Sequence, residues 1–496
     1  MKHLMICSEY PPAAGGGIGT YTYHMARLLA QHGEVVHVIG QLCPEARSEI
    51  EYSCGGRLIV HRLPYLLGSS PFGPKMNPAI RSKTARKLFR AGLIPQSFSW
   101  QAASLAEKLI TTEKIDVIEG QEFEAPLHFL QYRRTYPRQQ SRFALPPICV
   151  HFHSPTEFVT KWNELDATQP YFAAMKRLED FSIVAADGYL CPSKFLAEQM
   201  VEHYGLASED VAVIPYPIGD TPMITRPPSV WQNGSILYVG RLERRKGILE
   251  WLKAAVEVAG LYPDVHFEFI GENVLGTPSR CADEVLGQLI PKTVTNRFHF
   301  RGLLPRQDIP RYMASARMAV VPSRWENFPY SAIEQMSSGL PLLVSPQGGM
   351  GEMVKDGHSG WLASEMSSDG LAAALVGALR TEPERMAVMG KNAAAGIRAL
   401  CSDQAILTRH MDYKHALVAG RWRRRVAMTG QAVSSPIAEG IFFDVQNGFV
   451  PFPYAVQLTL RKIVSLVKTG LISPQTTLLP AFSRYWQNSL PKLSRG

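Results

Sequence analysis

Hydrophobic and polar positions along the chain alternate between two kinds of segment. Short apolar runs predict buried strands, and the amphipathic stretches between them predict helices, an order typical of doubly wound α/β domains. A polar, proline-rich segment at residues 219–235 separates two such series, and 496 residues suffice for two domains with their own cores. The predicted strands lie near residues 3–8, 34–39, 58–61, 116–118, 148–153, 189–191 and 211–214, then near 236–239, 266–270, 298–300, 318–321 and 341–344.

A glycine-rich turn follows the first predicted strand. Gly15-Gly16-Gly17-Ile18-Gly19-Thr20 opens a helix, as a dinucleotide-binding turn does, but its spacing is G-x-G-x-x-T. The second predicted strand also ends without the acidic residue that would hold an adenosine ribose, so NAD is not expected. Glycines without Cβ atoms still allow the backbone to approach a phosphate closely.

Two carboxylates eight positions apart stand where a loop meets a helix in the second half. Glu326 falls in the polar loop after the apolar run 318–321, and Glu334 falls in a helix that begins near Ser331 and stops near Gly339. The free N–H groups and the dipole of a helix start favour a phosphate, and Glu334 could accept hydrogen bonds from a ribose diol. Taken alone, such a pair is more often two solvated surface residues.

Two cations five positions apart, Arg241 and Lys246, follow the predicted strand 236–239. Charge runs usually line a solvated helix face, and that alternative stays open on the residues alone. A guanidinium and an ammonium are also the groups that stabilise a departing diphosphate.

Several separated motifs occur in an order that resembles a known family, the retaining glycosyltransferases of family 4, which are nucleotide-sugar-dependent group 1 enzymes. The second half carries VGRLERRKG (239–247), FHFRGLLP (298–305), VVPSRWENFPYSAIEQMSSGLPLLVS (320–345) and GGMGEMVKDGHSGWLA (348–363). The first half carries EYPPAAGGGIGTYTYHMARLLAQHGEVVHVI (9–39), HFHSP (151–155) and LCPSKFLAEQM (190–200). The resemblance extends over residues 1–420.

The resemblance implies the GT-B fold, two Rossmann-like doubly wound parallel-sheet domains that face each other across a cleft. It would place an acceptor-side domain at residues 1–218, a linker at 219–234 and a nucleotide-sugar-binding domain at 235–400. A helix at 401–420 would return to the N-terminal domain, and a helical, basic extension would occupy 421–496.

The implied activity is transfer of a sugar from a nucleotide-diphosphate sugar to a hydroxyl of a glycan, glycolipid, glycoconjugate or small-molecule acceptor, as in polysaccharide or cell-envelope biosynthesis. Retention of configuration and independence of metal ions come with it, and no Asp-x-Asp metal-binding sequence occurs in the chain. No cofactor is expected besides the nucleotide-sugar co-substrate.

The resemblance also assigns site residues. His151 is expected to be structural, and Arg244 and Arg245 are expected to face solvent. The catalytic candidates are His153, Arg241, Lys246 and Glu326, and the donor-binding candidates are Gly16, Gly17, Leu303, Asn327, Phe328, Tyr330, Ser331 and Glu334.

One departure from the family pattern concerns the donor loop. Where many relatives have Glu-Gly-Phe-Gly, this chain has Glu326-Asn327-Phe328-Pro329. Pro329 has no N–H group, so the amides of Asn327, Phe328 and Tyr330 must supply any backbone donors. The acceptor is expected to contact loops at 64–77 and 156–170, which do not identify it.

Two alternative functions remain open. A catalytically inactive scaffold of the same fold would bind nucleotide sugars without turnover, but the intact candidate residues argue against it. A nucleotide-sugar epimerase would not account for this order of motifs.

Positive charge is concentrated at the C-terminal end. The chain has a formal net charge of +9, and residues 421–496 contain ten Lys or Arg residues and only two acidic ones. Within this segment, residues 456–468 predict a basic amphipathic helix, which either packs on protein or rests on an anionic membrane surface. No nucleic-acid-binding motif accompanies it, so nucleic acid is not expected as a partner.

The N-terminal residues do not resemble a signal peptide, since the apolar run is short and leads directly into the glycine-rich turn. The seven cysteines include no Cys-x-x-Cys pair, which fits a reducing compartment. We therefore expect a cytoplasmic protein, or one bound peripherally to the cytoplasmic face of a membrane.

Overall fold

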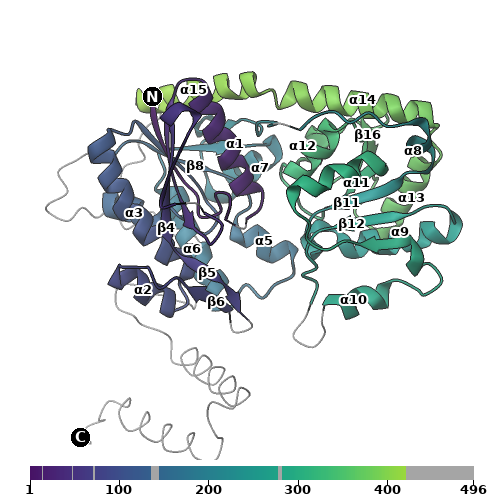
Figure 1. The fold of residues 1–496 in the computed structure, drawn as a ribbon, viewed down its shortest axis with the longest axis horizontal. Helices are drawn as coiled ribbons and strands as arrows, with labels where there is room; N and C mark the ends of the chain where they lie inside the picture. The colour runs from purple at the N-terminus through teal and green to yellow at the C-terminus, as the bar shows by residue number, and fades with distance from the viewer. Residues whose placement is uncertain are drawn as a thin grey trace, which may run out of the picture. The chain divides into compact units, whose positions relative to one another are not determined.

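The structure is a computed structural model. It describes residues 1–13, 15–46, 48–70, 73–135, 145–219, 221–276 and 282–420, all within one compact unit, Met1–Ala427. The predicted basic extension, with its amphipathic helix, lies outside the described residues. Two parallel sheets, one in each half of the unit, form its framework (Figure 1).

The N-terminal sheet has eight strands in the order β10-β9-β8-β7-β1-β2-β4-β3. The first strand lies in the middle of the sheet, where it pairs in parallel with both β2 and β7. All neighbours run parallel except the edge strand β3, which is antiparallel to β4. The bounds are β1 (Lys2–Ile6), β2 (Val35–Leu42), β3 (Ile50–Ser53), β4 (Leu58–Pro64), β7 (Val117–Gln121), β8 (Ile148–His151), β9 (Gly188–Cys191) and β10 (Val211–Val213).

The C-terminal sheet has six parallel strands in the order β13-β12-β11-β14-β15-β16. Its first strand again lies in the middle, between β12 and β14. The bounds are β11 (Ser235–Val239), β12 (Phe267–Ile270), β13 (Phe298–Phe300), β14 (Ala316–Val321), β15 (Leu342–Val344) and β16 (Gly360–Leu362).

Helices bury both faces of each sheet. Consecutive side chains of a strand point to opposite faces, and accordingly Leu4 and Ile6 pack in one hydrophobic cluster while Met5 packs in another. The described α-helices are α1 (Gly17–Gln31), α2 (Lys83–Arg90), α3 (Ile94–Glu113), α4 (His128–Thr135), α5 (Thr156–Trp162), α6 (Pro170–Val184), α7 (Lys194–Tyr204), α8 (Pro228–Asn233), α9 (Ile248–Leu261), α10 (Ala282–Leu289), α11 (Ile309–Ser315), α12 (Tyr330–Ser337), α13 (Ser368–Leu379), α14 (Pro383–Leu400) and α15 (Asp403–Val418).

The last two helices connect the sheets. α14 runs beside the C-terminal sheet, and α15 continues over the N-terminal sheet next to α1 (Figure 1). The Tyr413 ring of α15 lies against Gly188, where an added Cβ would collide with the phenol oxygen. None of the described helices is long and apolar enough to cross a membrane.

The prediction of two doubly wound parallel-sheet domains is confirmed, and every predicted strand has a counterpart. The sequence pattern missed the edge strands β3 and β16 and the antiparallel hairpin of β5 (Leu66–Ser70) and β6 (Gly73–Met76). β3 was missed because its apolar residues, Ile50 and Tyr52, are exposed. The segment expected to be a polar linker also differs, since it contains α8 and buries Trp231 and Arg226.

Candidate functional site

A buried ion pair lies at the carboxyl ends of two neighbouring strands of the C-terminal sheet. Lys246 ends a short 3-10 turn (Arg244–Lys246) after β11, and Glu326 lies in the loop after β14. The Lys246 ammonium contacts Glu326 Oε2, and Arg245 Nη1 lies 3.5 Å from the same oxygen. Because β11 and β14 pair in parallel, residues 80 positions apart meet at one edge of the sheet.

Arg245 corrects one expectation from the sequence. It was predicted to face solvent, but its guanidinium is buried and also contacts Glu243 at 2.8 Å. Arg244 is more exposed and pairs with Glu164 at 2.9 Å. The second buried cation therefore belongs to the arrangement around Glu326.

The charges of this cluster compensate one another. Burial opposes ionisation of Glu326, but Lys246 and Arg245 outweigh it and hold the pKa of this carboxyl below its usual value. Burial lowers the pKa of Lys246, and the neighbouring Glu326 carboxylate only partly opposes that shift. Glu326 is thus held as a carboxylate and can accept hydrogen bonds from a ligand's hydroxyls.

Glycines allow the backbone to close around the cluster. Gly247 and Gly348 both have positive φ angles, of 67° and 89°. A Cβ added to Gly247 would collide with the Pro322 carbonyl, and one added to Gly348 would collide with the Glu326 carbonyl. The backbone around the Glu326 loop therefore requires a residue without Cβ at both Gly247, before the loop, and Gly348, after it.

The same loop contacts the N-terminal half. Asn327 is buried, pairs with the Ser193 hydroxyl, and donates from Nδ2 to the His153 carbonyl oxygen at 3.3 Å. Its neighbour Phe328 meets the Tyr216 ring edge to face, with centroids 5.8 Å apart, and Tyr330 stacks on that ring at 5.2 Å. Donor-loop residues and the predicted His153 are therefore brought together by direct contacts.

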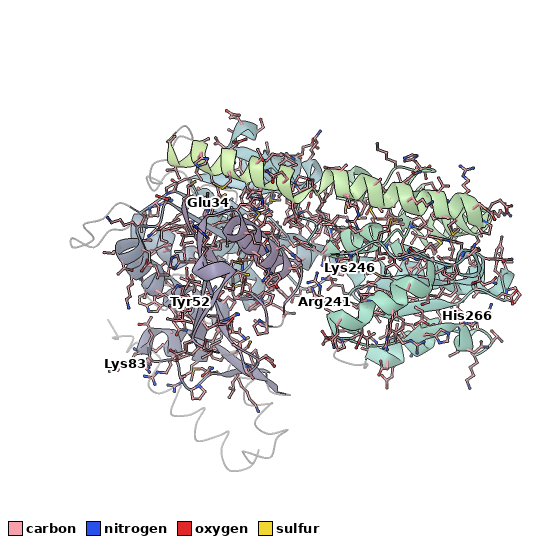
Figure 2. The ribbon with its side chains drawn as sticks, turned by 45° about the horizontal axis from the view of Figure 1, so that its top comes forward. Glu34, Tyr52, Lys83, Arg241, Lys246 and His266 are labelled. Carbon is pink, nitrogen blue, oxygen red and sulfur yellow. The ribbon has the colours of Figure 1, made fainter. Side chains whose placement is uncertain are left out.

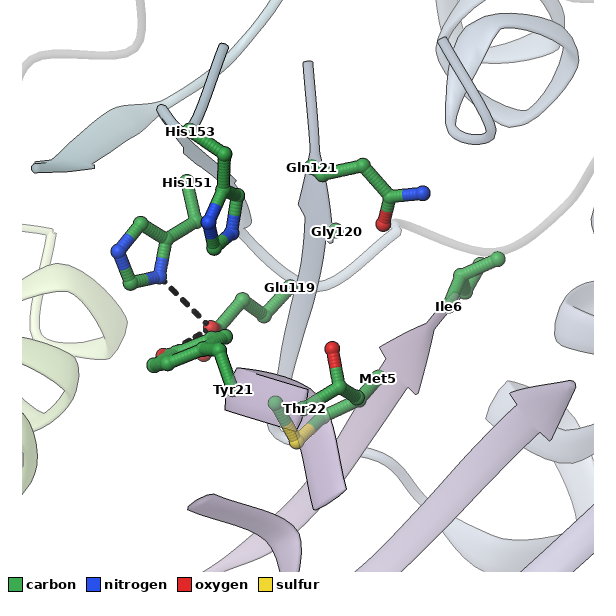
Figure 3. Close-up of a pocket in the computed structure, with 9 residues that line it drawn as sticks. All are labelled: Met5, Ile6, Tyr21, Thr22, Glu119, Gly120, Gln121, His151 and His153. Carbon is green, nitrogen blue, oxygen red and sulfur yellow. Dashed lines mark hydrogen bonds and ion pairs between the residues drawn. The ribbon is translucent and has the colours of Figure 1, made fainter. Parts of the chain in front are cut away.

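His153 belongs to a buried group of aromatic and ionisable side chains (Figure 3). Its ring stacks on His151 with centroids 4.5 Å apart, and its Nδ1 lies 2.5 Å from the Tyr216 hydroxyl. Burial, with the neighbouring His151, holds the pKa of His153 well below its usual value, so the imidazole is neutral. A cavity of about 10 Å³ adjoins both histidines, close to the room that one water molecule needs.

His151 has a different set of partners. Its Nδ1 lies 3.3 Å from Glu119, whose carboxylate also accepts a 2.6 Å hydrogen bond from the Tyr21 hydroxyl. The structure thus places both histidines in the interior, with His151 between His153 and Glu119.

Glu122 fixes the backbone beside His153. Its Oε1 accepts the N–H groups of His153 at 2.8 Å and Ser154 at 2.6 Å. Its Oε2 is buried and has no hydrogen-bond partner among the described residues. Burial raises the pKa of Glu122 to about 7, because these N–H donors only partly offset the loss of hydration.

The glycine-rich turn contains two kinds of glycine. An added Cβ on Gly15 or Gly19 would collide with Glu9, whereas Gly16 and Gly17 have open space at that position. Gly16 N–H donates to Glu9 Oε2 at 2.9 Å at the start of α1. The two glycines predicted to bind the donor are therefore the ones that leave room for a ligand.

Arg241, from the C-terminal half, lies near Glu9 and the glycine-rich turn. Its side chain is 57% exposed, 3.7 Å from Glu243, and its charge partly offsets the burial that raises the pKa of Glu9. Figure 2 shows Arg241 and Lys246 in the C-terminal half, at the side turned toward the N-terminal half. The Arg241 guanidinium is therefore exposed on the side of the C-terminal half that faces the glycine-rich turn.

The remaining candidates lie around α12. Glu334, in the second turn of α12, pairs with Arg306, which only partly offsets the burial that raises its pKa. Ser331 is in the first turn and partly exposed, and Leu303 is 78% exposed in the loop after β13. The Arg306–Glu334 contact places the 303–306 segment beside the start of α12.

Four residues that contribute to this site were not predicted from the sequence: Glu9, Glu122, Arg245 and Arg306. Each acts through a tertiary contact with a predicted residue or its loop. The one available signal was for Glu9, an acidic residue in the loop between the first strand and the glycine-rich turn. Among the described residues, no group of three or more His, Cys, Asp or Glu side chains is placed to hold a metal ion.

Models of two protein families match the chain, one in each half. The model described as Glycosyltransferase Family 4 matches residues 15–220, and the model described as Glycosyl transferases group 1 matches residues 230–395. Together they cover all of the candidate residues, the C-terminal sheet and every strand of the N-terminal sheet except β1.

Curated relatives match over both halves as well. Glycogen synthase of Mycobacterium tuberculosis is 25% identical over 419 residues, which span 81% of this chain and 91% of that protein. D-inositol 3-phosphate glycosyltransferase of Thermobifida fusca is 27% identical over 254 residues, 48% of this chain and 58% of that protein.

Solved structures share the fold at lower identity. Sucrose-phosphate synthase from Thermosynechococcus elongatus superposes with a TM-score of 0.62 at 19% identity, covering 84% of this chain and 99% of its own. HepE from Anabaena, solved in complex with UDP-glucose, has a TM-score of 0.55 at 17% identity, covering 84% of this chain and 100% of its own.

Proposed function

The chain belongs to family 4 of the glycosyltransferases, the group 1 enzymes with the GT-B fold, and we propose that it is a retaining transferase. It would move a sugar from a nucleotide-diphosphate sugar to a hydroxyl of a glycan, lipid-linked or small-molecule acceptor. The buried Lys246–Glu326 pair, with its loop docked on His153 through Asn327, is the observation that carries this proposal. Sugar-binding and diphosphate-binding groups from both halves meet there.

We assign each group a role by its chemistry. Arg241 and Lys246 hold the diphosphate from the C-terminal half. The backbone of Gly16 and Gly17 contacts it from the N-terminal half. Glu326, the amides of Asn327 and Phe328, and Tyr330 hold the sugar. Glu334 accepts hydrogen bonds from the ribose, near Ser331 and Leu303, and neutral His153 borders the sugar from the N-terminal side.

The proposed step is a front-face transfer. The bond between the anomeric carbon and the diphosphate oxygen breaks, and its electron pair leaves with the nucleoside diphosphate. The acceptor oxygen forms its bond to the anomeric carbon on the same face, and its proton passes to the departing phosphate oxygen. Lys246 and Arg241 stabilise the negative charge that grows on the diphosphate, so we propose that no metal ion is needed.

A thermal-shift panel of nucleoside diphosphates and nucleotide sugars tests the assignment. A ligand present at 100 times its dissociation constant stabilises the folded state by about 2.7 kcal/mol, which raises the melting temperature measurably. We expect nucleotides of one base to raise the melting temperature of the wild type but not that of the double variant Arg241→Ala/Lys246→Ala. Transfer of labelled sugar, with the anomer determined by NMR, then tests turnover and retention.

Arg244→Ala is the matched control. It removes a neighbouring cation of the same segment, but Arg244 points to Glu164 and not to Glu326. Equal loss of the ligand shift in both variants would contradict the diphosphate assignment. Ligand binding without any transfer to a range of acceptors would favour the inactive scaffold, and an inverted product would refute the retaining mechanism.

A further inference from the structure

A second polar cavity lies far from the proposed donor site. It has a volume of about 170 Å³, more than ten times what one water molecule needs, and is lined by segments around Gly234, Tyr262, Val265, Arg317 and Leu379. Gly234 precedes β11, Val265 precedes β12, and Arg317 is the second residue of β14. The cavity therefore lies at the amino ends of these parallel strands, opposite the edge that carries Arg241 and Glu326.

Arg317 is a buried cation that the protein leaves largely unpaired. Only 9% of the residue is exposed, and among the described residues its single hydrogen bond runs from Nη1 to the Gln232 carbonyl at 2.8 Å. Its Nε is enclosed without a partner, and in the part of the chain that the structure describes no carboxylate forms an ion pair with it. A guanidinium has five N–H donors and stays charged in proteins, so four of its donors and its charge have no protein partner among the described residues.

The backbone is shaped to place this side chain. The pairing of β11 with β14 shifts so that Ser235 faces Ala316 and Ile236 faces Met318, which leaves Arg317 as the extra residue of a β-bulge. Bulges redirect side chains and occur often near functional sites. Gly234 permits the close approach, since an added Cβ would lie 2.5 Å from the Val230 carbonyl oxygen and 2.8 Å from the Arg317 amide nitrogen.

A buried, uncompensated charge strongly destabilises a fold unless a counter-ion accompanies it. Burial lowers the pKa of Arg317, and no neighbouring carboxylate opposes that effect. Asp264 lines the cavity but is exposed at its mouth, beyond ion-pair reach of Arg317. A partner for these donors has to come from the solution that fills the cavity.

We propose that this cavity is a binding site for a phosphate group, held by the free donors of Arg317. Planar, forked guanidinium donors match the oxygens of phosphate, and the cavity has room for more than the phosphate itself. The ligand is either free phosphate or a small phosphorylated metabolite. The site is separate from the proposed transfer reaction and does not depend on it.

Binding is measured by calorimetry on the full chain carrying Arg241→Ala/Lys246→Ala, which removes the two cations proposed to hold the diphosphate. Inorganic phosphate and glycerol 3-phosphate are titrated separately, with glycerol as the blank. We expect one or both to bind, and Arg317→Met in the same background to weaken binding at least tenfold. Arg317→Lys keeps the charge but loses the forked pair of donors. Its affinity for phosphate should therefore lie between that of the background protein and that of Arg317→Met.

The two ligands distinguish the source of the phosphate. Binding of inorganic phosphate alone assigns the site to the free ion, and tighter binding of glycerol 3-phosphate assigns it to a phosphorylated metabolite. Equal affinities with and without Arg317 would mean that phosphate binds elsewhere, and no binding of either ligand would mean that water alone fills the cavity. Either result would overturn the proposal.

Asp264→Asn provides a test that does not alter the buried residue. It removes a negative charge from the cavity lining. Because Asp264 is exposed, folding should be unaffected. We expect phosphate to bind several-fold more tightly to this variant at low ionic strength, with the gain lost in high salt. An unchanged affinity at low salt would contradict phosphate binding in this cavity.

Discussion

Two glutamates near the proposed site show how neighbours set the ionisation of a single residue type. Glu326 and Glu122 are both buried, but burial is outweighed by Lys246 and Arg245 at the first and only partly offset by backbone N–H groups at the second. The pKa of Glu326 is therefore lowered, and that of Glu122 rises from 4.5 to about 7. Cations stabilise a carboxylate more than neutral donors do.

The raised pKa of Glu122 predicts a stability that falls as pH rises. Between pH 4.5 and about 7 the folded state keeps this proton while the unfolded state has released it, so the free energy of unfolding decreases across that window. The full effect of such a shift is about 3 kcal/mol. Urea unfolding of the wild type and Glu122→Gln at a series of pH values measures it.

Glu122→Gln keeps an oxygen to accept the N–H groups of His153 and Ser154 but cannot ionise. We expect its stability relative to the wild type to increase by about 3 kcal/mol from pH 4.5 to pH 7.5 and to stay constant at higher pH. A difference between the two proteins that does not change with pH would contradict the raised pKa.

At the level of elements, one buried ion pair fixes α15 on the N-terminal sheet. Lys414 of α15 is fully buried, and its ammonium lies 2.7 Å from Glu119 Oε2 of β7. Burial opposes ionisation of Glu119, but Lys414 outweighs it, so the pKa of Glu119 lies well below its usual value. The same carboxylate contacts Tyr21 and His151, so α15 acts on the residues behind His153.

Removing one partner of this pair should destabilise the fold strongly. Lys414→Met leaves Glu119 as a buried, unpaired charge, and such a change costs about 3–5 kcal/mol. The loss should be greatest at neutral pH and shrink on acidification, because Glu119 then takes up a proton. Chemical denaturation of the variant at pH 5 and pH 7.5 measures both effects.

The double variant Lys414→Met/Glu119→Gln separates the ion pair from packing. Since it removes both charges, we expect it to recover at least half of the stability lost in Lys414→Met. If the double variant is as unstable as the sum of the single variants, the two residues are not coupled and the ion pair does not hold α15.

Across the whole unit, a side chain of one half completes the core of the other. Trp325, in the loop before Glu326, is 1% exposed and packs in the hydrophobic cluster of the N-terminal sheet. Its ring stacks on Phe158 at 5.4 Å, and its Nε1 donates to Gln199 Oε1 at 3.1 Å. The donor loop therefore depends on both halves for its position.

Trp325→Ala should uncouple the two halves. Truncating a buried Trp costs about 3–5 kcal/mol of stability, and at Trp325 the lost contacts are those that join the two halves. We expect calorimetry to show one cooperative transition for the wild type and two for the variant. One transition at a lower temperature would instead mean that the other contacts between the halves suffice.

Glu164→Ala is the control for contacts at the edge of the same interface. Glu164 pairs with Arg244 and Arg324 at 2.9 and 2.6 Å, but about half of its side chain is exposed. Solvent screens such pairs, so the change should cost no more than about 1 kcal/mol and leave a single transition.

The local sequence predicted much of the fold because most strands are short runs of mainly apolar residues between amphipathic segments. Runs such as 298–300 and 318–321 coincide with β13 and β14, and the helix expected from Ser331 to Gly339 matches α12 within a residue or two. Glycine spacing and the Lys246 and Glu326 positions likewise follow from short motifs. Strands with exposed apolar residues, such as β3, gave no such pattern.

The sequence by itself determined the two-sheet architecture, the family and the residues that carry the proposed chemistry. The tertiary structure alone decided which charges are buried and which partners they have. Arg245 was expected in solvent yet is buried beside Glu326, and neither the Lys414–Glu119 pair nor the unpaired Arg317 could be read from local sequence. The physical reason is that periodicity reports one element at a time, whereas hydration and pairing of a charge depend on residues distant in the chain.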